Sequence, residues 1–65
     1  MITDKNSKGY KIACEIAEIW KREGKEAAIK AWERTYAGDK SLVFWVQHAI
    51  GDTVLSLLKQ QGIKP

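Results

Sequence analysis

Two side chains suited to acid–base chemistry, His48 and Asp52, are four positions apart. In a helix this spacing places both on one face, where a carboxylate can orient an imidazole that transfers a proton. Ser56 follows four residues later on the same strip. Three such groups in a row form a line rather than a pocket, and the sequence places no oxyanion hole beside them. We therefore interpret His48 and Asp52 as a solvated or interfacial ion pair and predict no enzymatic activity.

The potential metal ligands are few. Cys14 is the only cysteine and His48 the only histidine, whereas a structural zinc site takes four ligands. One thiol also excludes an internal disulfide. On a helical wheel Cys14 falls on the polar side of its segment, and we interpret it as an inert, partly buried thiol rather than a redox centre. The sequence thus predicts neither a metal nor a cofactor.

A basic cluster offers a second kind of chemistry. An Arg guanidinium can hold a phosphate, and an aromatic ring can stack on a base. The alternative function is therefore binding of an anionic ligand, a nucleotide or a nucleic acid through Lys30, Arg34, Tyr36 and Lys40. The i,i+4 spacing of Glu26 and Lys30 favours a solvated surface instead. The apolar residues 42–46 also argue against a DNA-reading helix at this point.

The chain has 65 residues and a net charge of +3. This length predicts a single helical domain over residues 1–65, with a polar N-terminal tail of about 6 residues. A domain of this size buries only about 60% of the surface that its unfolded chain exposes, so self-association is a common source of further stability. The polar start and the lone cysteine predict a cytoplasmic protein. The apolar run 42–46 is far shorter than the roughly 20 residues of a membrane span.

Apolar residues recur with the period of a helix, and no segment shows the period of two that indicates a strand. We predict an all-α fold, a small three-helix bundle with helices over about residues 7–23, 25–37 and 40–61. Gly24 and Gly38 separate the helices, and Gly24 is predicted to be the left-handed residue that ends the first. Gly62 followed by Ile63 predicts a Schellman ending for the third helix. Trp20 and Trp32 fall on core stripes.

The third predicted helix carries more apolar residues than one buried face needs. One stripe, which includes Val46, Ile50 and Val54, has the width of a core face. A second stripe contains Gly51, and a glycine in mid-helix costs about 1 kcal/mol relative to alanine. Its missing side chain would let another backbone approach closely. Trp45 falls at the margin of the remaining polar strip, beside His48 and Asp52, and two interpretations of it stay open: an interface anchor, or a ring that lies flat over the bundle.

Three interpretations of the second stripe remain open. The other two helices of the same chain cover it, another chain covers it, or it lies on a membrane surface, which the lack of lysines along the polar strip disfavours. The second interpretation predicts a non-catalytic helical interaction protein, a small regulator or inhibitor that binds a protein partner and itself, with self-association through the third helix. The predicted interface consists of Phe44, Trp45, His48, Gly51, Asp52, Leu55 and Leu58.

Overall fold

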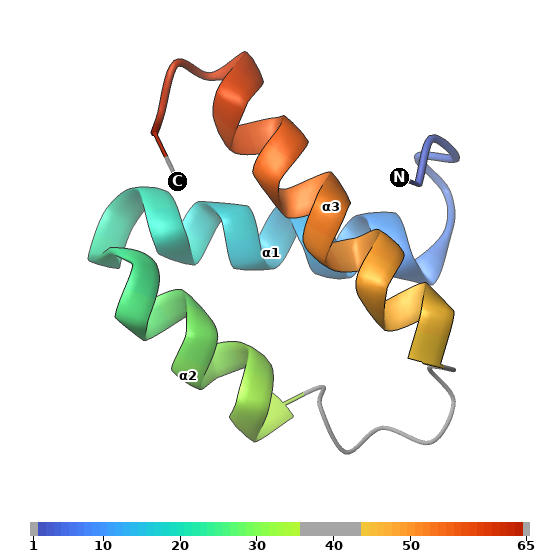
Figure 1. Cartoon of the computed structure of the whole chain (residues 1–65), viewed down its shortest axis with the longest axis horizontal. Helices are drawn as coiled ribbons and strands as arrows, with labels where there is room; N and C mark the ends of the chain where they lie inside the picture. Colours follow the sequence, from blue (N-terminus) through green and yellow to red (C-terminus); the bar gives the residue numbers. More distant parts are fainter. Residues whose placement is uncertain (1, 36–43, 65) are drawn as a thin grey trace.

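The computed structural model describes residues 2–35 and 44–64, and for residues 44–47 only the backbone. These residues form three helices, α1 (Lys8–Glu23), α2 (Lys25–Thr35) and α3 (Phe44–Gln60), with no strand among them. The predicted all-α three-helix fold is thereby confirmed. Figure 1 shows α1 in the middle, with α2 and α3 diverging from it. Both pack on α1, whereas the described parts of α2 and α3 do not approach each other at backbone-contact distance.

The predicted helix bounds agree closely with the structure where it describes them. The hydroxyl oxygen of Ser7 caps α1 by accepting a hydrogen bond from the N–H of Tyr10 at 3.1 Å. The Schellman ending of α3 is confirmed, since the N–H of Ile63 donates to the carbonyl of Leu58 at 2.9 Å and Gly62 has a φ of 75°. The predicted ends at residues 36–37 and 40–43, and Gly38 between them, lie outside the described residues.

Gly24 joins α1 to α2 without a loop. Its φ is 99°, a value that favours glycine, but its ψ of 173° is extended. The predicted left-handed helical conformation is therefore wrong in ψ. The cause is that α2 begins at the next residue: the N–H of Gly24 donates to Trp20 at 2.9 Å, and its carbonyl accepts from Ala28 at 3.1 Å. One glycine thus ends α1 and starts α2 in a new direction.

The core lies mainly between α1 and α3. Its buried hydrophobic residues are Ile12, Ala13, Ile16 and Ala17 of α1, Ala28 of α2, and Ile50, Val54 and Leu58 of α3. Within the described residues, α2 contributes only a small alanine to this set. The position of α2 consequently depends on its contact with α1 and on half-buried side chains such as Trp32.

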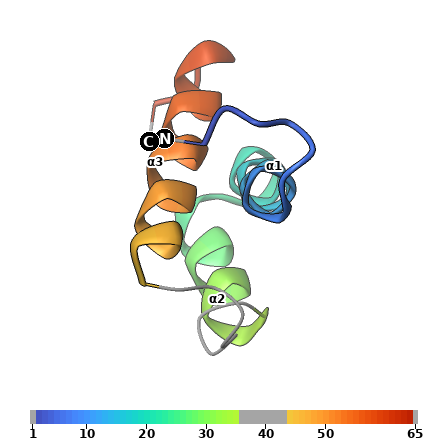
Figure 2. The same ribbon diagram turned by 90° about the vertical axis from the view of Figure 1, so that its right-hand side faces the viewer.

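The N-terminal tail is tied to α3. The N–H of Ile2 donates to the hydroxyl of Thr53 at 2.8 Å, and that hydroxyl donates to the carbonyl of Ala49 at 2.7 Å. The side chain of Ile2 packs against the core. A turn at Asp4, whose carbonyl accepts from the N–H of Ser7 at 3.0 Å, leads from the tail into α1. Figure 2 shows the tail passing over α1 toward α3, so this nominally polar segment closes one end of the core.

Candidate functional site

A groove opens between α2 and α3, whose described backbones both pack on α1 and do not approach each other closely. It has a volume of about 440 Å³. We call it the α2/α3 groove. Most of its lining is apolar and comes from all three helices: Ile16, Trp20, Ala28, Ile29, Trp32, His48, Ile50, Gly51, Asp52, Val54 and Leu55.

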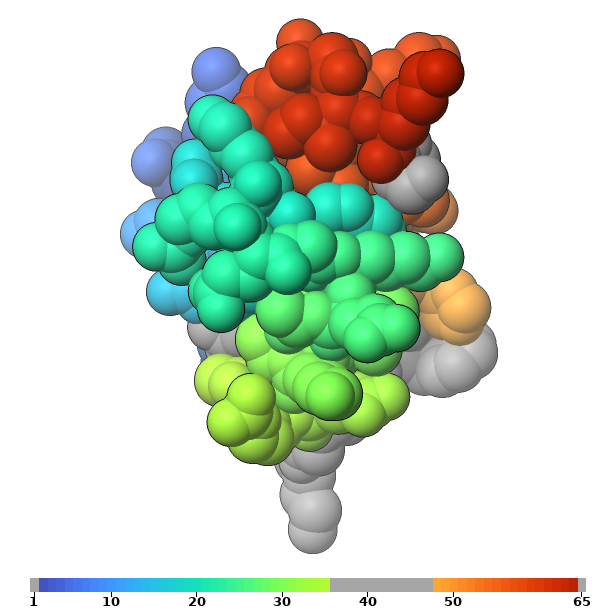
Figure 3. Space-filling model, turned by 90° about the vertical axis from the view of Figure 1, so that its left-hand side faces the viewer, coloured from blue at the N-terminus to red at the C-terminus, as the bar shows by residue number. Residues whose placement is uncertain are grey.

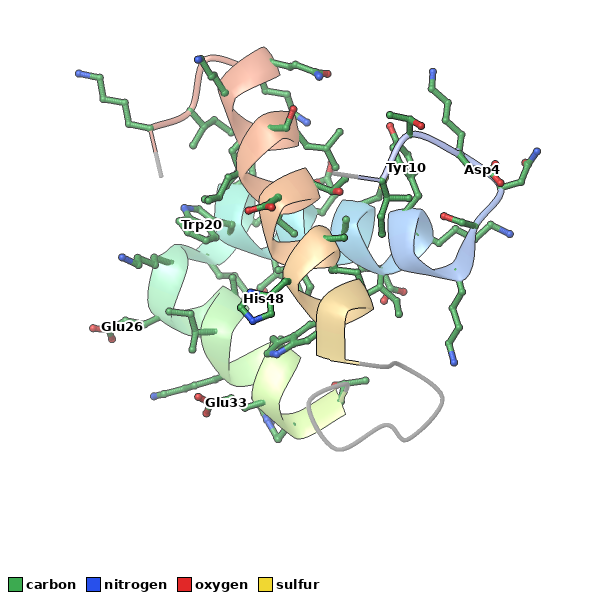
Figure 4. The ribbon with its side chains drawn as sticks, turned by 45° about the vertical axis from the view of Figure 1, so that its right-hand side comes forward. Asp4, Tyr10, Trp20, Glu26, Glu33 and His48 are labelled. Carbon is green, nitrogen blue, oxygen red and sulfur yellow. The ribbon has the colours of Figure 1, made fainter. Side chains whose placement is uncertain are left out.

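The figures show how the walls of the groove are built. Figure 4 shows His48 projecting from α3 on the side of α2, and Trp20 coming from α1 behind α3. Figure 3 views the molecule from the side where α1 turns into α2. There α2 and the end of α1 fill the face, with the last turns of α3 above them. The labelled carboxylates Glu26 and Glu33 point outward from α2 and do not line the groove.

Apolar surface is concentrated at this groove. Ile29 and Leu55 are the exposed large hydrophobic side chains among the described residues, at 42% and 44% of their full surface. Ile29 belongs to the α2 wall and Leu55 to the α3 wall. Single exposed hydrophobic residues are normal in proteins, but two that flank a hollow containing tryptophans indicate a binding surface.

Gly51 lies open on the α3 wall. A Cβ atom added there would meet no other described side chain or helix within 4 Å. Within the described residues, the neighbouring helices therefore do not cover this position. A backbone that approaches Gly51 closely, as the sequence predicted, would therefore belong to residues outside the described ones or to another chain.

The predicted interface residues do not all lie together. His48, Gly51, Asp52 and Leu55 are exposed and line the α2/α3 groove. Leu58 has 0% exposure and belongs to the core, which corrects its assignment to an open surface. It lies four residues after the buried Val54, on the ridge that faces α1. The side chains of Phe44 and Trp45 lie outside the described residues.

The groove also contains residues that the sequence interpretation assigned only to packing. Trp20 and Trp32 are half-buried and pack against the core, as predicted, but each keeps part of its surface in the groove. Ile29, on the apolar half of the second helix by helical wheel, is exposed and lines the groove. The high number of tryptophans, 3 in 65 residues, is the sequence signal that could have indicated a role at the surface.

Among the described residues that line the groove, His48 and Asp52 are the ones with titratable side chains. Both are exposed, one helical turn apart, and Ser56 does not line the groove with them. In the described part of the chain, no group of three or more His, Cys, Asp or Glu residues could hold a metal ion. Cys14 is half-buried on α1, in a different hollow.

The predicted anion-binding cluster is only partly described. Lys30 and Arg34 do line one shallow hollow of about 400 Å³ on α1 and α2. Glu23 and Glu26 line the same hollow, so two carboxylates accompany the two cations. Tyr36 and Lys40 lie outside the described residues.

No family model, no curated protein and no solved structure matches this chain. Within the residues that the structure describes, none of the helices has the length and apolar character needed to cross a membrane.

Proposed function

We propose that the protein acts by binding, without catalysis, and that the α2/α3 groove receives the apolar face of a helix from a protein. The observation that supports this most strongly is the open apolar hollow of about 440 Å³, in whose wall no other described element covers Gly51. Helix-in-groove recognition uses apolar anchors three or four residues apart, which enter a hollow of this kind. A role as a small regulator or inhibitor follows if such binding blocks or recruits the partner.

A helix suits the groove better than a small apolar molecule does. Ile29 and Leu55 line opposite walls of the hollow and are 42% and 44% exposed, so an occupant that covers both has to extend over the rim as well as into the hollow. A helix has a diameter of about 10 Å with its side chains and would cover both walls while inserting one or two side chains between them. Tryptophan, abundant in this groove, is also enriched at protein interfaces.

Binding of an anionic ligand has less support. Lys30 and Arg34 share their hollow with Glu23 and Glu26, which would repel a phosphate. The positive electrostatic potential at this hollow is therefore weaker than the one that the cations in the sequence suggested.

The proposal is tested with NMR and a model peptide. The indole N–H signals of Trp20 and Trp32 are assigned and followed while an amphipathic leucine- and lysine-rich helical peptide is added. A peptide of the same composition, scrambled to lose its apolar face, is the control. We expect shifts of both indole signals with the amphipathic peptide only.

Two variants locate the binding site. Gly51→Leu places a side chain in the groove and should weaken peptide binding at least about tenfold, a change of about 1.4 kcal/mol. Gln60→Leu adds the same side chain at an exposed position of α3 away from the groove and should bind as the natural protein does. Absence of indole shifts, or equal binding by both variants, would refute a groove site.

A further inference from the structure

We propose that the occupant of the α2/α3 groove is α3 of a second copy of this chain, packed antiparallel so that His48 of each copy faces Asp52 of the other. This inference rests on the proposed function, because it names the partner of the same groove. It is supported by the spacing of two polar residues, by the open position between them and by the apolar residues beside them.

The spacing of His48 and Asp52 is self-complementary. The two residues are one helical turn apart on the exposed face of α3, and the midpoint between them is residue 50, next to Gly51. A two-fold axis at this level reverses the order in the second copy, so that residue 52 of one copy stands opposite residue 48 of the other. Such an interface is isologous, and a single patch supplies both the donor and the acceptor of each pair. An imidazole N–H donates to a carboxylate oxygen in two symmetric contacts.

Charge also selects the orientation. A parallel arrangement would place the two Asp52 carboxylates together and the two His48 rings together. Like charges at close range destabilise an interface, whereas the antiparallel arrangement brings each carboxylate to a ring. The groove lining carries an imidazole donor at residue 48 and a carboxylate acceptor at residue 52. It therefore favours a partner with the reverse order of donor and acceptor, and an antiparallel second copy has this order.

Gly51 allows the close approach that this arrangement needs. Gly51 lies one residue along α3 from residue 50, which marks the level of the two-fold axis. A Cβ atom added to Gly51 would meet no other described side chain or helix within 4 Å. Helix axes in contact lie 8–10 Å apart depending on the side chains between them, and glycine permits the lower end of that range. A second α3 lying along the first would also cover Leu55 and lean over the groove toward Ile29.

The association is expected to be weak. One helix pair with a few flanking side chains falls below the roughly 1,200 Å² of a stable interface, so we expect a dissociation constant in the micromolar range or above. The dimer should therefore appear in sedimentation as the concentration rises from about 10 μM to 1 mM.

Charge variants test the pairing directly. His48→Asp gives a chain with carboxylates at both positions, and the double variant H48K/D52K gives one with ammonium groups at both. Each alone should raise the dissociation constant of the dimer at least about tenfold, because like charges then face each other. An equimolar mixture should form a heterodimer with an affinity within about threefold of the natural protein. Gln60→Asp and Gln60→Lys, exposed on α3 outside the groove, are the matched controls and should dimerise normally.

The outcomes separate this inference from the proposed function. A natural protein that remains monomeric at 1 mM, but still binds the amphipathic peptide, would show that the groove receives a different partner. Charge variants that dimerise as the natural protein does, or a mixture that stays monomeric, would refute the antiparallel pairing. Failure of both peptide binding and dimerisation would remove the proposed function as well. Circular dichroism of each variant checks that it is folded.

Discussion

The two sides of α3 have different surroundings. The side toward α1 buries Ile50, Val54 and Leu58 and is joined to the N-terminal tail through Thr53. The side toward α2 has an open Gly51 and an exposed Leu55. The comparison shows how a single helix can separate stability from binding. Substitutions on the first side should change the free energy of unfolding, and those on the second side should change association.

The largest expected effect is the loss of Leu58. Truncation to alanine removes a fully buried side chain and leaves a cavity beneath α1, which should lower stability by about 2–5 kcal/mol. A domain of this size has only about 3–5 kcal/mol to lose, so the variant should be largely unfolded at 25 °C. Thermal and urea unfolding followed by circular dichroism measure this. A folded variant with altered mass would instead place Leu58 in the interface.

Overpacking at Gly9 should have the next largest effect. A Cβ there would lie 2.5 Å from Cδ1 of Ile2 and 3.3 Å from Cγ1 of Ile50, between the tail and α3. Gly9→Leu should therefore lower stability by about 1–3 kcal/mol in the same unfolding experiments. Gly9→Ala is the graded control and should have a smaller effect, because the end of the Ile2 side chain can move. Equal stability of the leucine variant would mean that the tail does not pack there.

Removal of the Thr53 hydroxyl should have a moderate effect. Thr53→Val keeps the shape of the side chain but leaves the N–H of Ile2 and the carbonyl of Ala49 without this partner. The expected loss is about 1 kcal/mol in urea unfolding, with faster exchange of the Ile2 amide proton. Ser56→Ala, which removes a hydroxyl from a less buried position of the same helix, is the control. An unchanged Ile2 exchange rate would contradict the anchoring of the tail.

Gly51→Leu should raise the stability of the fold and weaken association. The free energy of unfolding should rise by up to about 1 kcal/mol, because a helix former replaces glycine where the described residues leave space. Association should weaken, since the new side chain keeps the second helix away. Thermal melts and sedimentation at the same concentration measure both. Loss of stability without a change in mass would mean that the same chain covers this position.

Arg34→Ala should have the smallest effect. Arg34 is exposed, and substitutions at such positions usually change stability by no more than about 0.5 kcal/mol. Dimerisation and peptide binding should also remain, because Arg34 does not line the α2/α3 groove. Titration with a nucleotide panel completes the experiment. If the natural protein bound a nucleotide and the variant did not, the anionic-ligand function would take precedence.

The fold could be predicted from the sequence where the signals are local. The sequence offers Asn6 or Ser7 as a cap for the first helix, and the structure has Ser7 in this role. Gly24 after α1 and the pair Gly62–Ile63 after α3 likewise act through residues within one turn, so these signals are readable without the rest of the chain. The apolar period likewise identifies the helices. The conformation of Gly24 was only half predicted, because its ψ depends on where α2 begins.

The candidate site could be predicted only in part. A helical wheel placed Gly51, Leu55 and Leu58 on a second apolar stripe and His48 and Asp52 on the remaining strip, and it left open what covers the stripe. In the structure Leu58 is buried and the other four are exposed. A helical wheel describes one helix in isolation. It gives no information on where α1 packs across α3, and this contact decides which row of α3 side chains is buried. The groove itself arises from the divergence of α2 and α3, and the tie between Ile2 and Thr53 joins residues 51 positions apart. Neither the groove nor this hydrogen bond is encoded in a local sequence pattern.

The small share of α2 in the described core has a consequence for the motions of the protein. Because Ala28 is its one buried residue among those described, we expect α2 to open before the contact between α1 and α3 is lost. Such partial opening has a lower free energy than global unfolding, so the amide protons of α2 should exchange with solvent before those in the middle of α1 and α3. Small displacements of α2 would also widen or narrow the groove. The wall opposite Gly51 is thus adjustable, and the site can adapt to helices that carry side chains of different size.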